Sequence, residues 1–167
     1  MNQPKVTFDA FIEAFPAATL PMVLTEESIH HFNKANQPFP ALMVDQYLSP
    51  LEGLESLDEF TEFIPCFRIE DITDFIAVVY YKAALLNHQY VLATFTKKAE
   101  VIDKKVIAGT FSDNQTLINS VATINEDWEI IIVSGTQPAN EPYRFDPTKS
   151  TSQQLEILPV GKIVNHD

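Results

Sequence analysis

The chain has 167 residues, of which 46% are hydrophobic, so it is long and apolar enough to fold as one domain with a buried core. Its 23 acidic and 11 basic residues give a net charge of -12, which argues against nucleic acid or an anionic membrane surface as a partner, because both need clustered Lys and Arg. A single cysteine, Cys66, excludes a disulfide within the chain, and its apolar surroundings indicate a buried, inert thiol.

The N-terminal part, residues 1–62, is expected to be mainly helical. Thr7 is a suitable N-cap for a helix over residues 8–15. Residues 16–24 form an apolar run with two prolines and are expected to cross the sheet as extended chain. A second short helix is predicted over residues 25–36, whereas the apolar run 41–48 fits a helix or a strand.

The stretch 49–62 is predicted to be a third helix with an acidic stripe. Its acidic side chains recur at the spacing i, i+3, i+4 and i+7, which places them on one exposed face: Glu55, Asp58, Glu59 and Glu62. Like charges at this spacing destabilise an isolated helix by a few tenths of a kcal/mol each, so local stability does not explain the stripe. Residues 1–74 hold thirteen acidic and three basic residues, a charge of -10, and residues 75–167 hold ten and eight, a charge of -2. The acidic N-terminal face is therefore predicted to bind a basic protein.

The rest of the chain, residues 63–167, reads as consecutive strands rich in Val, Ile, Thr, Tyr and Phe, separated by short polar turns. Connections this short favour antiparallel pairing. Pro65 places the first strand, residues 63–70, at an edge of the sheet. We therefore predict one α+β domain, in which two or three short N-terminal helices pack on a curved antiparallel meander sheet of about seven or eight strands.

Residues 136–154 form a long polar connection with three prolines and are predicted to be a mobile loop. Within it, Tyr143 and Arg144 are candidates for partner binding, because exposed Tyr and Arg are enriched at binding hot spots.

The order of several short patterns resembles small uncharacterised bacterial α+β proteins, some of them exported as lipoproteins. These patterns are a Phe-Pro step at Phe15 followed by a later Leu-Pro, the strand LATFTK, the turn through Asp103, and the closing hairpin LEILPVGKI. The resemblance implies an antiparallel sheet with helices packed on it, and it carries over no functional residue. No stretch approaches the ~20 apolar residues of a membrane span. We expect a soluble protein, cytoplasmic if the chain is complete and exported if a leader has been removed.

No metal, cofactor or catalytic residue is predicted. On a helix, Glu26 with His30 and Glu27 with His31 form i, i+4 pairs, but adjacent histidines point about 100° apart and do not join in one site. There is no G-x-S-x-G nucleophile motif, and four glycines cannot build a phosphate-binding loop.

Three classes of function are compatible with these patterns. The leading hypothesis is a non-enzymatic binding protein that uses its acidic face. The alternative is a small-molecule-binding protein or enzyme with a pocket between the sheet and the helices, lined by Cys66, Tyr80, Tyr81 and His88. The tyrosine pair places one phenol on each face of the sheet. The third class is a scaffold component that associates with copies of itself.

Overall fold

The computed structural model describes residues 5–53, 55, 57–112, 115–138 and 150–166, and shows an α+β fold. The helical elements are α1 (Phe8–Glu13), α2 (Ser28–Ala35), α3 (Ala41–Met43), the π-helical segment η1 (Val44–Leu48) and α4 (Ser49–Glu52). The strands are β1 (Ala17–Ala18), β2 (Met22–Leu24), β3 (Glu62–Ile69), β4 (Ile76–Ala83), β5 (Asn87–Phe95), β6 (Val101–Ser112), β7 (Thr116–Ile124), β8 (Glu129–Pro138), β9 (Thr151–Ile157) and β10 (Ile163–Asn165).

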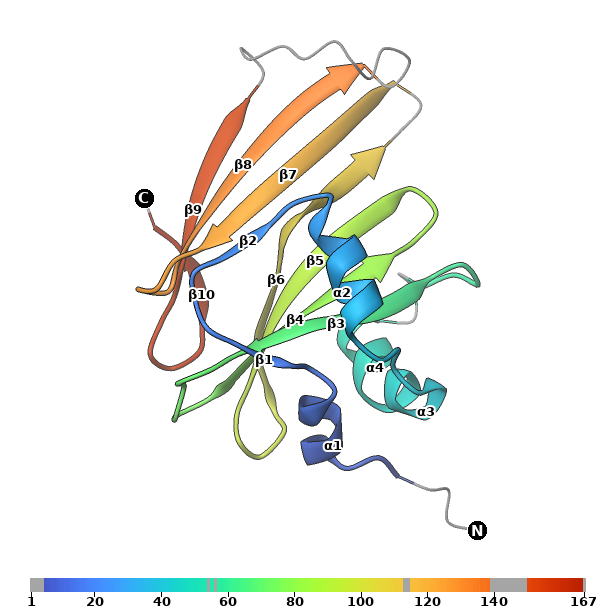
Figure 1. The fold of residues 1–167 in the computed structure, drawn as a ribbon, viewed down its shortest axis with the longest axis vertical. Helices are drawn as coiled ribbons and strands as arrows, with labels where there is room; N and C mark the ends of the chain where they lie inside the picture. The colour runs from blue at the N-terminus through green and yellow to red at the C-terminus, as the bar shows by residue number, and fades with distance from the viewer. Residues whose placement is uncertain (1–4, 54, 56, 113–114, 139–149, 167) are drawn as a thin grey trace.

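The strands form one ten-stranded sheet in the order β1-β3-β4-β5-β6-β7-β8-β9-β10, with β2 paired to β7 (Figure 1). All pairs are antiparallel except β1 with β3, so the predicted meander is confirmed. The sheet has more strands than predicted because the extended segment 16–24 adds two short ones, β1 at one edge beside β3 and β2 beside β7.

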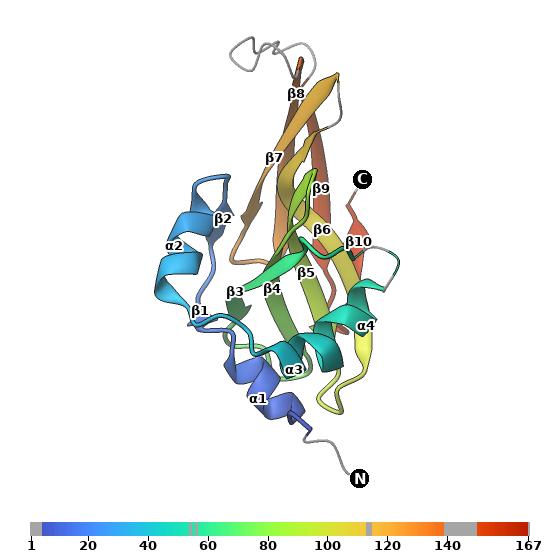
Figure 2. The ribbon, with the colours of Figure 1, turned by 90° about the vertical axis from the view of Figure 1, so that its right-hand side faces the viewer.

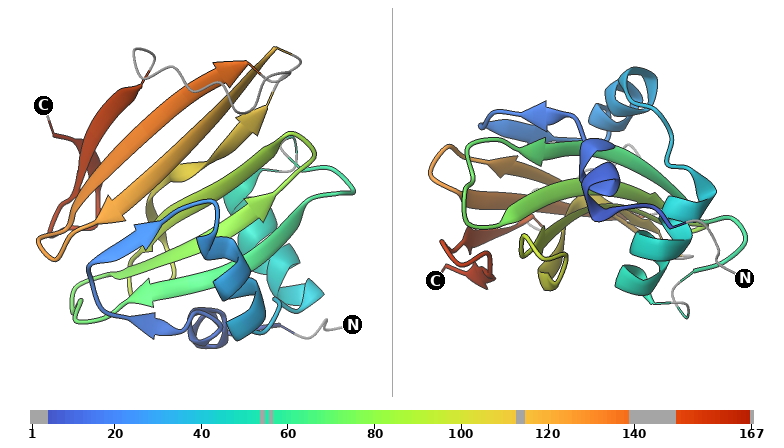
Figure 3. Two further views of the ribbon diagram at one scale, coloured as in Figure 1. Left: turned by 45° about the horizontal axis from the view of Figure 1, so that its top comes forward. Right: turned by 90° about the horizontal axis from the view of Figure 1, so that it is seen from below.

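The sheet bends so that β3–β5 and β7–β9 form two arms joined by the long strand β6 (Figure 3). The main hydrophobic core lies on the inner face, which all the long strands share. It includes Phe67, Leu92, Ile124, Ile130 and Leu155, which are all nearly or fully buried. A core that draws on both arms holds the bend in place, because opening the arms would expose these side chains to water.

A second core covers the outer face of β4 and β5. Phe11 of α1, Phe15 just after that helix and Leu48 of η1 are fully buried against Tyr80 and Val91. Figure 2 shows α1, α3 and α4 gathered at one end of this face. The helix α1 begins as predicted, because Thr7 accepts a hydrogen bond from the amide of Ala10 at 3.1 Å.

The helix α2 lies over the edge strand β3 (Figure 1) and buries Ile29 and Phe32, as predicted. Just after its end, the Asn36 side-chain amide donates hydrogen bonds to the carbonyls of Pro65 and Cys66 at 2.7 and 3.0 Å. These bonds satisfy backbone acceptors on the free edge of the sheet, which would otherwise be open to another strand.

The prediction of a helix over residues 49–62 is wrong. The helix α4 ends at Glu52, because Gly53 has φ of +85°, a conformation that ends helices. A turn then forms at Asp58, whose carboxylate accepts hydrogen bonds from the Phe60 amide at 2.8 Å and the Thr61 hydroxyl at 3.1 Å. Glu62 already belongs to β3, so the four acidic residues share no helix face.

The first strand, predicted over residues 63–70, does not keep one apolar face along its length. A bulge between Pro65 and Phe67 shifts the pairing of β3 with β4. As a result, Phe63 packs in the outer core, whereas Phe67 and Ile69 pack in the inner core. The edge position predicted from Pro65 holds for the first part of β3 only, because β1 pairs with the outer side of this strand at Arg68 and Ile69.

Candidate functional sites

An acidic groove lies between the α3–η1 segment and the start of β3. Its volume is about 530 Å³, and its lining includes the apolar side chains of Phe39, Val44 and Phe63. Two exposed carboxylates, those of Asp45 and Glu62, line the same groove. The arrangement combines an apolar surface with negative charge, which suits a segment that carries both apolar and basic side chains.

The loop that leads into this groove adds further charge and one exposed ring. Glu55, Asp58 and Glu59 are all exposed, as the stripe hypothesis required, although they do not lie on one continuous helix. Phe60 is 61% exposed and follows Asp58 in the hydrogen-bonded turn that presents it to solvent. Large exposed aromatic residues beside charges are common at binding surfaces.

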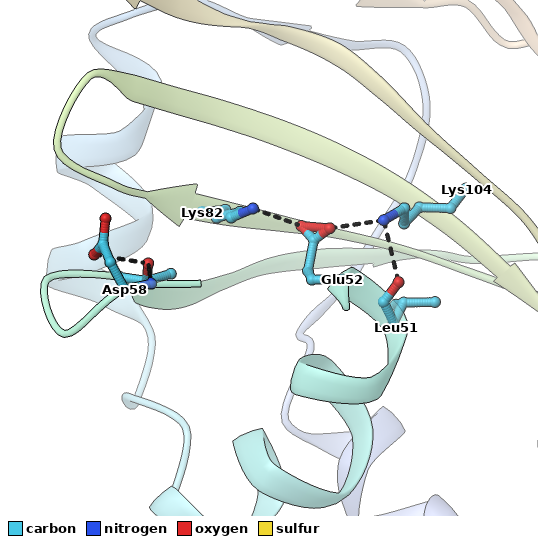
Figure 4. Close-up of polar contacts among 6 residues, drawn as sticks. Leu51, Glu52, Asp58, Lys82 and Lys104 are labelled. Carbon is cyan, nitrogen blue, oxygen red and sulfur yellow. Dashed lines mark hydrogen bonds and ion pairs between the residues drawn. The ribbon is translucent and has the colours of Figure 1, made fainter. Parts of the chain in front are cut away.

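A buried charged cluster lies at the base of the same loop (Figure 4). The Glu52 carboxylate is 2.7 Å from the Lys104 ammonium and 3.9 Å from the Lys82 ammonium. The Glu52 and Lys82 side chains are only 6% and 9% exposed, whereas that of Lys104 is 30% exposed. Lys104 also donates to the carbonyl of Leu51 at 3.1 Å, near the C-terminus of α4, where a cation is favourable.

This charged cluster attaches α4 to the sheet, because Lys82 belongs to β4 and Lys104 to β6. The cluster also affects the protonation of Tyr80, which is fully buried on the outer face of β4. Burial and then the neighbouring Glu52 carboxylate raise the pKa of the Tyr80 phenol, so it stays protonated at neutral pH. Sequence reasoning missed Glu52. The available signal was Lys82, which lies inside the apolar run of β4, because a buried lysine needs an acidic partner.

Of the four residues predicted to line one pocket, Tyr80 lies apart in the outer core. Cys66 and Tyr81 lie in the inner core, and the rings of Tyr81 and His88 are 6.0 Å apart. Tyr80 and Tyr81 do point to opposite faces, and Tyr81 packs against Tyr90 in the inner core with ring centres 4.9 Å apart. Cys66 lines a groove beside α2, and His88 lines a separate cavity between the arms of the sheet. Burial raises the pKa of the Cys66 thiol, which keeps it protonated and weakly nucleophilic.

The groove beside α2 lies between that helix and strands β1, β2 and β3, and has a volume of about 460 Å³. Its lining is largely apolar, with Met22, Phe32 and Phe67 contributing, and His31 adds an imidazole. It is the described space that best matches the predicted pocket between sheet and helices. Its volume falls within the range of roughly 300–1,000 Å³ for ligand sites.

The histidines of α2 do not pair with glutamates as expected. The helix begins at Ser28 with Glu27 as its N-cap residue, so Glu26 and Glu27 precede the helix. Among the residues that the structure describes, no group of three or more His, Cys, Asp or Glu side chains is placed to hold a metal ion. Tyr143 and Arg144 lie outside the described residues.

Comparison of the chain with protein-family models, curated proteins and solved structures finds no match. The resemblance to small bacterial α+β proteins therefore stays a prediction. No helix among the described residues is long and apolar enough to cross a membrane.

Proposed function

We propose that this chain is a non-enzymatic binding protein whose acidic groove takes a basic, partly apolar segment of another protein. The observation that carries the proposal is the groove between α3–η1 and β3, where Asp45 and Glu62 flank apolar side chains. Between Lys34 and Arg68 the sequence contains six acidic and no basic residues. A basic segment would meet no repelling charge from this part of the chain.

The two lysines nearest the loop do not neutralise the exposed acidic residues of the groove. Lys82 and Lys104 both face Glu52 across 3.9 and 2.7 Å, so they neutralise that buried carboxylate rather than the exposed ones. The charges of Asp45, Glu55, Glu59 and Glu62 therefore remain available to a partner. Asp58 is different, because its carboxylate also holds the turn at Phe60.

The test compares two variants that neutralise four exposed acids each. The groove variant carries Asp45→Asn, Glu55→Gln, Glu59→Gln and Glu62→Gln, and leaves the turn at Asp58 intact. The control variant carries Glu70→Gln, Asp74→Asn, Glu100→Gln and Glu126→Gln, which lie in exposed turns at the opposite end of the strands. Both variants have the same net charge, -12 + 4 = -8.

Each protein is immobilised and used to capture proteins from cell lysate at low and physiological salt, followed by mass spectrometry. We expect wild type and the control variant to retain the same basic proteins, and the groove variant to lose them. The binding segment of a retained protein is then mapped by peptide titration against amide shifts of the groove residues. Equal loss by both variants would mean that net charge alone held the captured proteins, and the proposal would fail. Circular dichroism checks that both variants are folded.

A small-molecule site is the second candidate function, favoured by the groove beside α2 and its apolar lining. Its test is Ala35→Trp, which places a large ring at the exposed rim of this groove without entering the core. A ligand that co-purifies with wild type, detected by native mass spectrometry and lost in the variant, would support this function. A ligand retained by the variant would exclude this groove as its site.

A further inference from the structure

The sheet opens between β6 and β7, and this opening forms a cavity separate from both grooves. Only the last four residues of β6 pair with β7, from Gly109 opposite Ser120 to Ser112 opposite Leu117. Further along β7, residues 122–124 pair with β2 instead. The cavity at this divergence has a volume of about 300 Å³, and we call it the β6–β7 cavity.

Polar residues replace apolar ones where the inner face reaches this cavity. On β7 the inner row runs from the buried Ile124 and Ala122 to Ser120, and on β8 it runs from Ile130 and Ile132 to Ser134. On β9 the row that contains Ile157 and Leu155 continues to Gln153 in the same way. Three neighbouring strands therefore change from apolar to polar at one level of the sheet.

The two serines face each other directly and are joined by a hydrogen bond of 2.7 Å between their hydroxyls. In such a pair one hydroxyl donates to the other, so one hydrogen and several lone pairs remain for a further partner. His88 and Gln153 also line the cavity and can donate or accept. Around these polar groups lie the apolar side chains of Ile107, Ile118 and Ile132.

Apart from His88, every residue that lines the cavity is uncharged. None of its fourteen residues is Asp, Glu, Lys or Arg, although the chain as a whole has a net charge of -12. An ion that entered would lose hydration without meeting an opposite charge, which is unfavourable. An uncharged molecule with a polar group would instead exchange its water for the hydroxyls and amide of the lining.

We propose that the β6–β7 cavity binds an uncharged small molecule that has an apolar ring and one amide or hydroxyl group. The ring packs on the three isoleucines, and the polar group bonds to the pair Ser120 and Ser134. A volume of about 300 Å³ suits a ligand of one ring, at the small end of known ligand sites. This site does not depend on the acidic groove, which lies on other elements of the fold.

The test uses two pairs of probes that match in size and differ in charge: benzamide with benzoate, and nicotinamide with nicotinate. Each probe is titrated to millimolar concentration while the isoleucine methyl signals of the intact protein are followed by NMR. We expect the amides to shift the Ile107, Ile118 and Ile132 methyls saturably. We expect the carboxylates to bind at least about tenfold more weakly, since the cavity offers them no counter-charge.

Two variants separate binding from folding. Ser120→Ala with Ser134→Ala should weaken benzamide binding by about threefold to tenfold, because both hydroxyls are lost. Ser152→Ala is the control, since Ser152 is exposed on β9 and does not line the cavity. The fluorescence of Trp128, the only tryptophan, checks that each variant is folded.

Three outcomes would overturn the proposal. The first is the absence of a saturable shift with either amide. The second is equal binding of amides and carboxylates, and the third is benzamide affinity that is the same in the serine variant as in wild type.

Discussion

Replacing Glu52 by leucine is expected to destabilise the protein more than any other single change in the buried charged cluster. The Glu52 carboxylate forms ion pairs with both Lys82 and Lys104, and its side chain is 6% exposed. In the variant, the Lys82 amine would lose the Glu52 carboxylate in surroundings that leave its side chain only 9% exposed. Lys104 is 30% exposed and can turn toward water, so the loss of Glu52 should destabilise the protein less through Lys104 than through Lys82.

The size of the effect follows from the distances. With an effective dielectric constant of about 20, Coulomb's law gives an attraction of about 4 kcal/mol between Glu52 and Lys82 at 3.9 Å, before the cost of desolvation. The same estimate gives about 6 kcal/mol between Glu52 and Lys104 at 2.7 Å, reduced by solvent because Lys104 is part exposed. Removing one partner of a buried pair typically costs about 3–5 kcal/mol. We therefore expect Glu52→Leu to lower the free energy of unfolding by about 3–5 kcal/mol, and Lys104→Met by about 1 kcal/mol.

A double-mutant cycle tests this reasoning. The double variant Glu52→Leu with Lys82→Met should be more stable than Glu52→Leu alone, because apolar pairs of similar volume replace buried ion pairs at little cost. Urea unfolding at neutral pH, followed by Trp128 fluorescence, gives the four free energies. If Glu52→Leu costs less than about 1 kcal/mol, or if adding Lys82→Met makes it less stable still, the cluster is solvated and the argument from burial fails.

Two further predictions concern pH and the backbone. Burial is the main cause that raises the pKa of three tyrosines above 10.0, to about 12 for Tyr81 and higher for Tyr80 and Tyr90. The unfolded chain then releases these protons first, so the free energy of unfolding should fall as the pH rises above 10, by about 1.4 kcal/mol per pH unit for each tyrosine. Urea unfolding that gives the same free energy above and below pH 10 would contradict this. Gly109→Ala should cost more than about 3 kcal/mol, because its new Cβ would lie 2.0 Å from the His88 carbonyl oxygen. Gly53→Ala should cost only about 1 kcal/mol, from its φ of +85° with no atom within 4 Å, and equal losses in thermal unfolding would refute the steric argument.

The sheet could be predicted because each strand carries its own signal. Runs of β-branched and aromatic residues end at polar turns, such as the turn at Asn125, whose amide donates to the Glu129 carbonyl at 2.8 Å. The two added strands β1 and β2 could not be assigned as strands, because segments of two and three residues have no periodicity to detect. Only their extended backbone was indicated by the prolines.

The acidic helix could not be predicted correctly because two local contacts override the spacing of its charges. Gly53 adopts a conformation that ends α4, and the Asp58 side chain bonds to the backbone that follows it. The sequence therefore indicated which residues are exposed and acidic, but not how they are arranged. Asp45 lines the groove together with Glu62, and it lies in the segment 41–48, which fitted a helix or a strand. The groove could therefore not be predicted from the sequence.

The charged cluster and the β6–β7 cavity needed the tertiary structure for a different reason. Lys82 signals a buried partner, yet nothing local points to Glu52, which reaches it from another element. Likewise, Ser120 and Ser134 each look like ordinary polar residues of a strand. Their position becomes informative only when the register places them opposite each other on the inner face, at the end of an apolar row.

Two buried side chains in the described part of the chain, those of Cys66 and Tyr80, are held in their protonated forms. Burial keeps the Cys66 thiol protonated by raising its pKa, and burial together with Glu52 does the same for the Tyr80 phenol. Lys82, the most buried lysine among the described residues, faces the Glu52 carboxylate across 3.9 Å. A nucleophile or general base needs the opposite shift, toward the deprotonated form at neutral pH. The exposed carboxylates of the acidic groove and the neutral hydroxyls of the β6–β7 cavity are instead suited to recognising a partner by charge or by hydrogen bonds, which is why both proposals are for binding.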